Sequence, residues 1–128
     1  MDLARYGSQF KNVYSAPVSV AAAATGVIVA AVPAVAGGPG TGFQAAPAKA
    51  IGVVGFNLTS DTAHTTAQFQ SSTGPVNLTG AMIMPVDGNL KQDIGDDVLF
   101  QTLPGAALDL AAVTGAVHGW VNYILLPE

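Results

Sequence analysis

The chain has 128 residues and a formal net charge of −4, with 9% of its residues charged and 50% hydrophobic. This length suits one domain with a modest core. Its four basic residues argue against nucleic-acid binding, and its zero cysteines exclude disulfides, thiolate catalysis and cysteine-ligated zinc. So low a charge content favours a protein that functions in contact with other proteins.

The N-terminal segment, residues 1–16, carries aromatic residues every four positions, at Tyr6, Phe10 and Tyr14. Arg5 and Lys11 lie beside them and are half of the basic residues of the chain. Aromatic and arginine side chains dominate the energetics of protein interfaces. We therefore predict an arm that docks on a partner, with an arm folded back on its own domain as the open alternative.

Residues 15–40 form a long apolar run without charge, which raises the question of a secretory or membrane segment. The small residues at 34–36 have the form of a signal cleavage site, and a membrane span needs about 20 apolar residues. However, Pro17, Thr25-Gly26 and Pro33 divide the run into pieces of strand length. We therefore favour strands and expect neither a membrane span nor a membrane partner.

Within this run, strands are expected at 18–20 and 27–32, joined by a turn at Thr25-Gly26. The uniformly apolar second segment predicts a strand buried on both faces. Alanine is the best helix former, so a helix is the alternative, but the β-branched residues favour a strand. The following residues, 35–48, are nearly all Ala, Gly and Pro around Phe43, and predict a long mobile loop. Such loops are often functional, although a surface insertion without function is equally compatible.

The rest of the chain consists of short β patterns separated by turn signals, and no stretch has a sustained helical period. Strands are expected at 50–59, 64–71, 76–78, 81–84, 98–103, 106–112 and 117–124. The alternation changes phase between Val53 and Val54, which predicts a β-bulge. The expected fold is all-β, a jelly-roll-like antiparallel sandwich of about eight strands spanning residues 17–128, preceded by the extended arm.

Catalytic, metal-binding and cofactor-binding patterns are missing from the sequence, so we expect a non-enzymatic protein without a metal or cofactor. His64 and His118 have no recognised ligand spacing, and no nucleophile elbow is present. The acidic stretch 87–97 lacks the EF-hand spacing and is expected to be a solvated turn, with Ca²⁺ binding as the alternative.

Several segments together resemble the small jelly-roll decoration or cement proteins on the capsids of tailed bacteriophages. They are 27–33, 50–59, 78–82, 88–90, 104–110 and 119–123, and the resemblance extends over most of residues 18–126. It departs from that pattern at 35–48, where a short basic turn is usual. This segment could instead serve as a contact loop.

The resemblance implies a virion protein made in the bacterial host cytoplasm and located on the capsid surface. Its partners would be the major capsid protein and other copies of itself, as a dimer or trimer. The candidate interface residues are Arg5, Tyr6, Phe10, Lys11, Tyr14 and Phe43. The alternative is a host-receptor or glycan-binding module of a head or tail fibre, for which Trp120 with Asn122 is the candidate site, although packing in a core or interface is favoured for Trp120.

Overall fold

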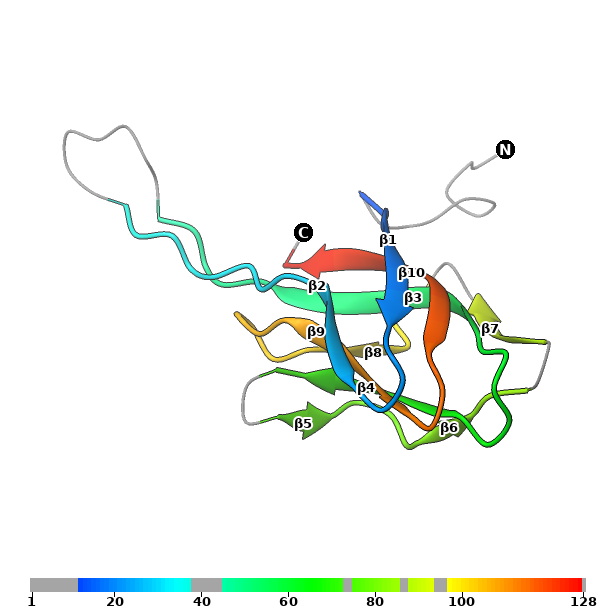
Figure 1. The fold of residues 1–128 in the computed structure, drawn as a ribbon. Coiled ribbons are helices and arrows are strands. Elements are labelled where there is room, and N and C mark those ends of the chain that lie inside the picture. The colour runs from blue at the N-terminus through cyan, green and yellow to red at the C-terminus, as the bar shows by residue number, and fades with distance from the viewer. Residues whose placement is uncertain (1–11, 38–44, 73–74, 86–87, 94–96, 128) are drawn as a thin grey trace, which may run out of the picture.

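The computed structural model describes residues 12–37, 45–72, 75–85, 88–93 and 97–127. They form two antiparallel sheets packed face to face as a β-sandwich (Figure 1). The strands are β1 (Tyr14–Val20), β2 (Thr25–Val29), β3 (Ala50–Thr59), β4 (Thr66–Ser71), β5 (Val76–Asn77), β6 (Met82–Ile83), β7 (Asn89–Asp93), β8 (Phe100–Gln101), β9 (Leu108–Val113) and β10 (Val117–Leu126). The all-β prediction is confirmed.

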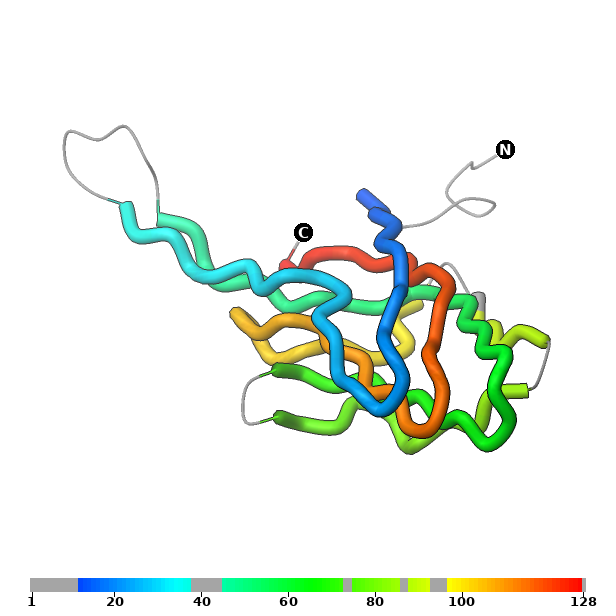
Figure 2. The backbone as a smooth tube through the Cα atoms, in the orientation of Figure 1, coloured from blue at the N-terminus to red at the C-terminus, as the bar shows by residue number. Residues whose placement is uncertain are grey.

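The strand order is that of a jelly roll. Sheet A has the order β1-β10-β3-β7, and sheet B has the order β2-β9-β4-β5, with the short strands β8 and β6 added to β3 and β4. The chain crosses repeatedly between the sheets, so that its first and last strands are neighbours in sheet A (Figure 2). This double Greek-key arrangement is found in viral capsid and lectin domains.

The centre of sheet A is the pair β3 and β10, whose register shifts between Asn122 and Tyr123. Asn122 is opposite Gly55 and Tyr123 is opposite Val53, so Val54 is the extra residue of a bulge. The predicted phase change at Val53 and Val54 is therefore confirmed.

Glycine at position 52 lets three side chains cover the outer face of sheet A beside the bulge. A Cβ atom there would lie 3.1 to 3.3 Å from side-chain atoms of Leu126, Ile124 and Val98. This cover explains why the first part of β3 is buried on both faces and reads as a nearly continuous apolar run.

The core lies between the sheets and contains a cluster of three phenylalanine rings. Phe69 in β4 lies between Phe56 in β3 and Phe100 in β8, with ring centroids 5.3 and 5.0 Å apart. Phe69 is fully buried. These contacts join the two sheets directly, so the rings contribute both area burial and inter-sheet orientation.

Two details of the 15–40 run differ from the prediction. Thr25 and Gly26 belong to β2, and the turn is at Ala22 and Ala23, where Ala23 adopts φ 54°. β2 is also an edge strand paired with β9 alone, so Val27 is 65% exposed rather than buried on both faces. Sequence could not reveal this, because a β-branched run suits an edge strand as well as a central one.

The acidic stretch also differs from its prediction as a turn, because Asn89–Asp93 form the strand β7 at the edge of sheet A. Leu90 packs against the core while Lys91 and Gln92 are exposed. A single inward apolar residue leaves too weak a period-two signal for sequence analysis.

None of the described elements is a helix with the length and apolar character needed to span a membrane.

Candidate functional site

The most prominent exposed feature is a two-stranded arm formed by residues 31–37 and 45–49, between β2 and β3. Val35 and Ala46 exchange two backbone hydrogen bonds of 2.8 Å, and Lys49 N donates to Val32 O at 3.0 Å. The arm projects away from the sandwich (Figure 1). Within the predicted 35–48 loop, Val35 and Ala46 therefore form an isolated antiparallel bridge. Phe43 lies outside the described residues.

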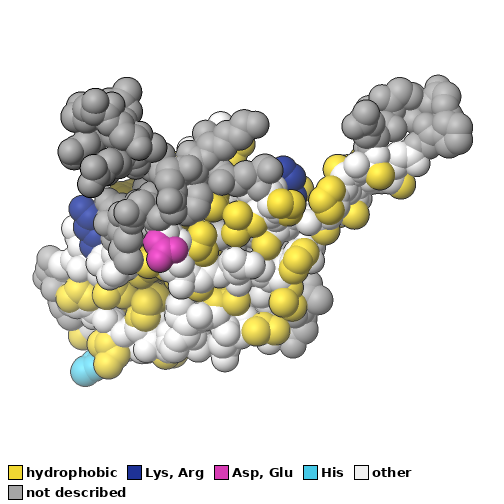
Figure 3. All heavy atoms as spheres, turned by 180° about the vertical axis from the view of Figure 1, so that it is seen from behind, with side chains coloured by type: hydrophobic (Ala, Val, Ile, Leu, Met, Phe, Trp, Pro, Cys, Tyr) yellow, Lys and Arg dark blue, Asp and Glu magenta, His cyan; other side chains and the backbone are white. Residues whose placement is uncertain are grey.

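Most apolar side chains of the arm are exposed rather than packed against the sandwich. Val35 is 51% exposed, and most of the other described residues at 31–37 and 45–47 are also exposed. Hydrophobic side chains line the arm in Figure 3. An isolated two-stranded ribbon is marginally stable in water, and three strands or a packing partner are normally needed. The arm therefore has the physical properties of a segment that packs against another molecule.

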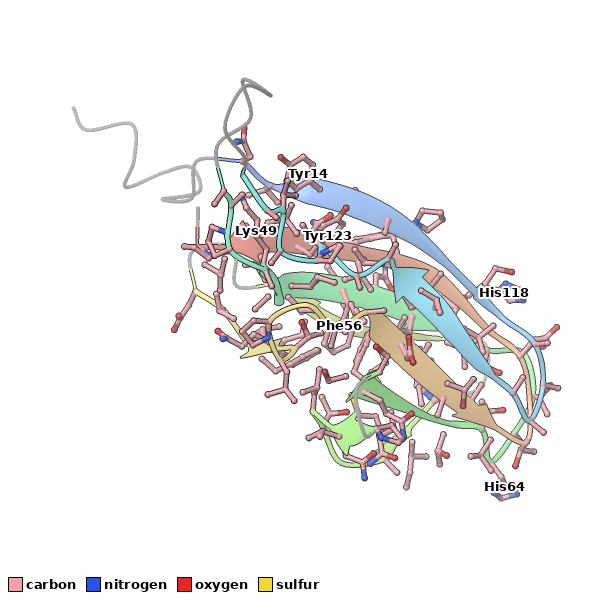
Figure 4. The ribbon with its side chains drawn as sticks, turned by 90° about the vertical axis from the view of Figure 1, so that its left-hand side faces the viewer. Tyr14, Lys49, Phe56, His64, His118 and Tyr123 are labelled. Atoms are coloured by element: carbon pink, nitrogen blue, oxygen red, sulfur yellow. The ribbon has the colours of Figure 1, made fainter. Side chains whose placement is uncertain are left out.

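Tyr14 is the one predicted interface residue that lies within the described chain; Arg5, Tyr6, Phe10 and Lys11 lie outside it. Tyr14 begins β1 and stacks on Tyr123 of β10, with the ring centroids 5.4 Å apart. It is 43% exposed. The pair lies at the same end of the molecule as Lys49, at the base of the arm (Figure 4). The last residues of segment 1–16 thus belong to sheet A, and Ala16 is buried.

His118 lies at the opposite end of the molecule from Tyr14 (Figure 4). It lines an open depression of about 330 Å³ together with Thr59, Ser60, Asp61, Gly88 and Asn89. Thr59 Oγ1 donates a 3.3 Å hydrogen bond to the His118 carbonyl, and Thr62 Oγ1 donates to Asp61 Oδ1 at 3.4 Å. Local hydrogen bonds therefore engage the Thr59 and Asp61 side chains of this lining.

His64 is exposed in the turn before β4. Among the residues that the structure describes, no three His, Asp or Glu side chains gather in a way that could hold a metal ion. Part of the acidic stretch 87–97 lies outside that description, so its Ca²⁺ alternative stays a prediction.

Trp120 lies on the outer face of sheet A, where its neighbours across the strands are Pro17 in β1 and Asn57 in β3. It alternates with the buried Val121 and is half-buried. Asn122, two residues along the same strand, shares this face. Trp120 is therefore outside the core between the sheets, and its exposed part is available to a ligand or partner.

The outer face of sheet B is nearly uncharged, and sequence analysis did not identify it as a surface. Strand register places ten side chains on it: Thr25, Val27, Thr66, Gln68, Gln70, Asn77, Ile83, Asp109, Ala111 and Val113. Ile83 is 76% exposed and Val113 is 56% exposed. Burial raises the pKa of Asp109, the one ionisable residue in this set.

Sequence alone could find each of these side chains but not their common face. Val113, Thr66 and Ile83 lie side by side in three strands, although they are far apart in the chain. The period-two alternation of β4 and β9 was a usable signal for which residues point outward. It did not reveal which strands would be neighbours.

Comparison of this chain with protein families, curated proteins and solved structures gave no match.

Proposed function

We propose that this protein is a non-enzymatic capsid decoration or cement protein of a bacteriophage. In this proposal, it binds the outer capsid surface and stabilises contacts between major capsid subunits, and its copies associate with one another. It would be made in the host cytoplasm and assembled onto the virion.

The observation that carries this proposal is the exposed apolar arm on a compact sandwich. A cement protein needs a rigid body and an extended element that buries area on a neighbouring subunit. The arm extends beyond the sandwich, and its uncovered Val, Ala and Pro side chains gain free energy on burial. The jelly roll supports the proposal by analogy, since this fold occurs in capsid proteins, but folds host many functions.

The proposal also fits the low charge of the chain. With 9% of residues charged, much of the surface is neutral, which lowers the desolvation cost of binding another protein. A free monomer, by contrast, benefits from a charged surface that keeps it dispersed. The composition is thus better suited to an assembly than to free diffusion.

The test is co-sedimentation with capsid particles of the phage that encodes the chain, using Val35→Asp in the arm. A charge on this exposed position should leave the melting temperature nearly unchanged but reduce capsid binding at least tenfold. The matched control is Ser19→Asp, which changes another exposed position, in β1 on the outer face of sheet A. Equal binding by both variants and the unaltered protein would overturn the role of the arm.

The predicted N-terminal arm needs its own truncation. Removing residues 1–16 would also remove the first half of β1, including the buried Ala16. Removal of 1–11 avoids this, because β1 begins at Tyr14. If the segment docks on the capsid, this deletion weakens co-sedimentation while the melting temperature is maintained.

The alternative function is a host-receptor or glycan-binding module of a fibre. It is favoured by Trp120, which lies outside the core beside Asn122, an arrangement of an aromatic face and an amide that suits sugars. Because Trp120 is the single tryptophan of the chain, its fluorescence reports binding directly. A saturable change on titration with host-surface glycans, lost in Asn122→Ala, would favour this alternative over the cement role.

A further inference from the structure

We propose that the depression lined by His118 and Asp61 binds a neutral pyranose sugar, whose apolar face contacts the ring of Trp120. This inference goes beyond the capsid role proposed above and does not depend on it. It also assigns a different position from the alternative site at Asn122, because His118 and Asn122 lie on opposite sides of Trp120 along β10.

Strand register places Trp120 beside the depression. His118, Thr59 and Asn89 form one row across β10, β3 and β7, and all three line the depression. The next row on the same face contains Trp120, with Asn57 opposite it in β3. Side chains two residues apart on a strand lie about 7 Å apart on one face, so a ligand of one or two sugar rings can contact both rows.

The side chains of the lining supply the hydrogen-bonding groups that sugar hydroxyls need. Asn89 and neutral His118 each provide a donor and an acceptor, and the Asp61 carboxylate accepts. All three residues are exposed. Asp61 Oδ1 accepts one hydrogen bond from Thr62 Oγ1, but a carboxylate has about four acceptor positions, so most of its capacity remains. Because each sugar hydroxyl both donates and accepts, this mixed set of groups suits a sugar.

The charge and the aromatic ring beside the depression favour a neutral sugar. The described lining contains one carboxylate, Asp61, and neither lysine nor arginine. An anionic ligand would therefore meet a like charge there, whereas Lys91 lies in the row of Trp120, outside this lining. A pyranose has an apolar C–H face and hydroxyls at its rim, so it can pack on Trp120 while its hydroxyls reach the polar row.

Hydrogen bonds in the turn after β3 restrain the backbone at Asp61. Ser60 Oγ donates to Thr65 Oγ1 at 3.2 Å and accepts from Thr62 N at 3.3 Å. Thr65 Oγ1 donates to the Thr62 carbonyl at 2.8 Å. His64 completes the turn with φ 65°, which non-glycine residues rarely adopt. A turn fixed before the ligand arrives lowers the entropic cost of binding.

Asn57 adds an unsatisfied acceptor to the row of Trp120. Its Oδ1 is shielded and accepts no hydrogen bond from a described residue. Most buried polar atoms in proteins have a partner. A sugar hydroxyl can supply this partner when the side chain turns outward.

The size of the depression fits a small sugar and predicts weak binding. Its volume of about 330 Å³ lies at the lower end of the range of small-molecule sites, roughly 300 to 1,000 Å³. Because the depression is open, it covers only part of the ligand surface. Binding is therefore expected in the millimolar range.

Titration with methyl pyranosides tests the proposal, with Trp120 fluorescence and saturation-transfer NMR as two readouts. The probes are the methyl glycosides of glucose, galactose and mannose, and at least one should give a saturable signal with both methods. Sorbitol has similar hydroxyl groups on an open chain, so it is the control ligand and should give no saturable signal. N-acetylneuraminic acid is the anionic probe and should bind at least tenfold more weakly than the best methyl pyranoside.

Two matched variants locate the site. Asp61→Ala should weaken binding of the best probe at least tenfold while the melting temperature is retained. Asp97→Ala removes another exposed carboxylate, outside the described lining, and should leave the affinity unchanged.

The proposal is overturned if no methyl pyranoside exceeds sorbitol, if both alanine variants bind equally, or if the anionic sugar binds most tightly. Loss of binding in Asn122→Ala with unchanged binding by Asp61→Ala would assign the sugar to the alternative site and likewise overturn it. The experiment uses purified protein without capsid, and Val35→Asp should bind the sugar normally. Failure of this proposal is therefore distinguishable from failure of arm-dependent capsid binding.

Discussion

The arm and β3 are consecutive in the chain and both largely apolar, yet they have opposite environments. Residues 45–49 of the arm are exposed or half-buried, whereas Ala50 to Phe56, which follow directly, are all buried. β3 has β10 on one side, β7 and β8 on the other, and sheet B beneath it. The arm strand has one partner strand, at Val32 and Val35.

This difference shows that apolar residues serve two purposes in this protein. In β3 they allow close packing of two sheets, and their burial contributes to the free energy of folding. In the arm, the same free energy is available to a binding partner. Three substitutions in the folded body, the first two with a matched control, test how sharp this division is.

The largest effect is expected from truncating the central core ring, Phe69→Ala. The ring is fully buried between Phe56 and Phe100, so its removal should lower the free energy of unfolding by about 3–5 kcal/mol. The matched change in the arm, Val35→Ala, should alter it by less than about 0.5 kcal/mol. Chemical denaturation measures both values. Comparable losses would show that the arm contributes to folding stability and would break the comparison.

A smaller but still large effect is expected from Gly119→Ala in β10. Gly119 has φ 146°, and a Cβ atom there would clash with the Asn57 carbonyl oxygen. Backbone strain and displacement of β3 should together cost more than about 2 kcal/mol.

The control for this change is Gly80→Ala, where a Cβ atom meets nothing within 4 Å. Its melting temperature should stay close to that of the unaltered protein. If Gly119→Ala melts at the same temperature as Gly80→Ala, the close approach of β10 and β3 is not a constraint on the fold.

The smallest effect is expected from Asp109→Asn on the outer face of sheet B. Desolvation raises the pKa of Asp109 in the folded protein above its unfolded value. The folded state then binds the proton more tightly, so this residue's contribution to stability falls as pH rises from below the unfolded pKa through the folded pKa. Asp109→Asn should therefore raise the melting temperature slightly at pH 7 and have less effect at pH 3. A decrease at pH 7 would indicate that the ionised carboxylate is stabilising, which contradicts the expected sign.

Local sequence patterns determined the strands with the clearest alternation, such as β4, β9 and β10, because side chains on opposite faces of a strand must differ in polarity where one face is buried. They also determined the bulge at Val54, since an extra residue reverses the alternation. The proposed identity as a virion protein rests on the resemblance of several segments to capsid decoration proteins and stays a proposal.

The tertiary structure decided which strands became neighbours and therefore which surfaces exist. β2 lies at the edge of sheet B, and this position leaves Val27 exposed. Residues Asn89–Asp93 form a strand despite their polarity because they pair with β3. The tertiary structure also joined the two sides of the predicted 35–48 loop through the Val35–Ala46 bridge and gathered a face with one ionisable described residue, Asp109, from five separate strands. Pairing between distant segments depends on the packing of the whole chain, whereas alternation reports only on the two faces of a single strand.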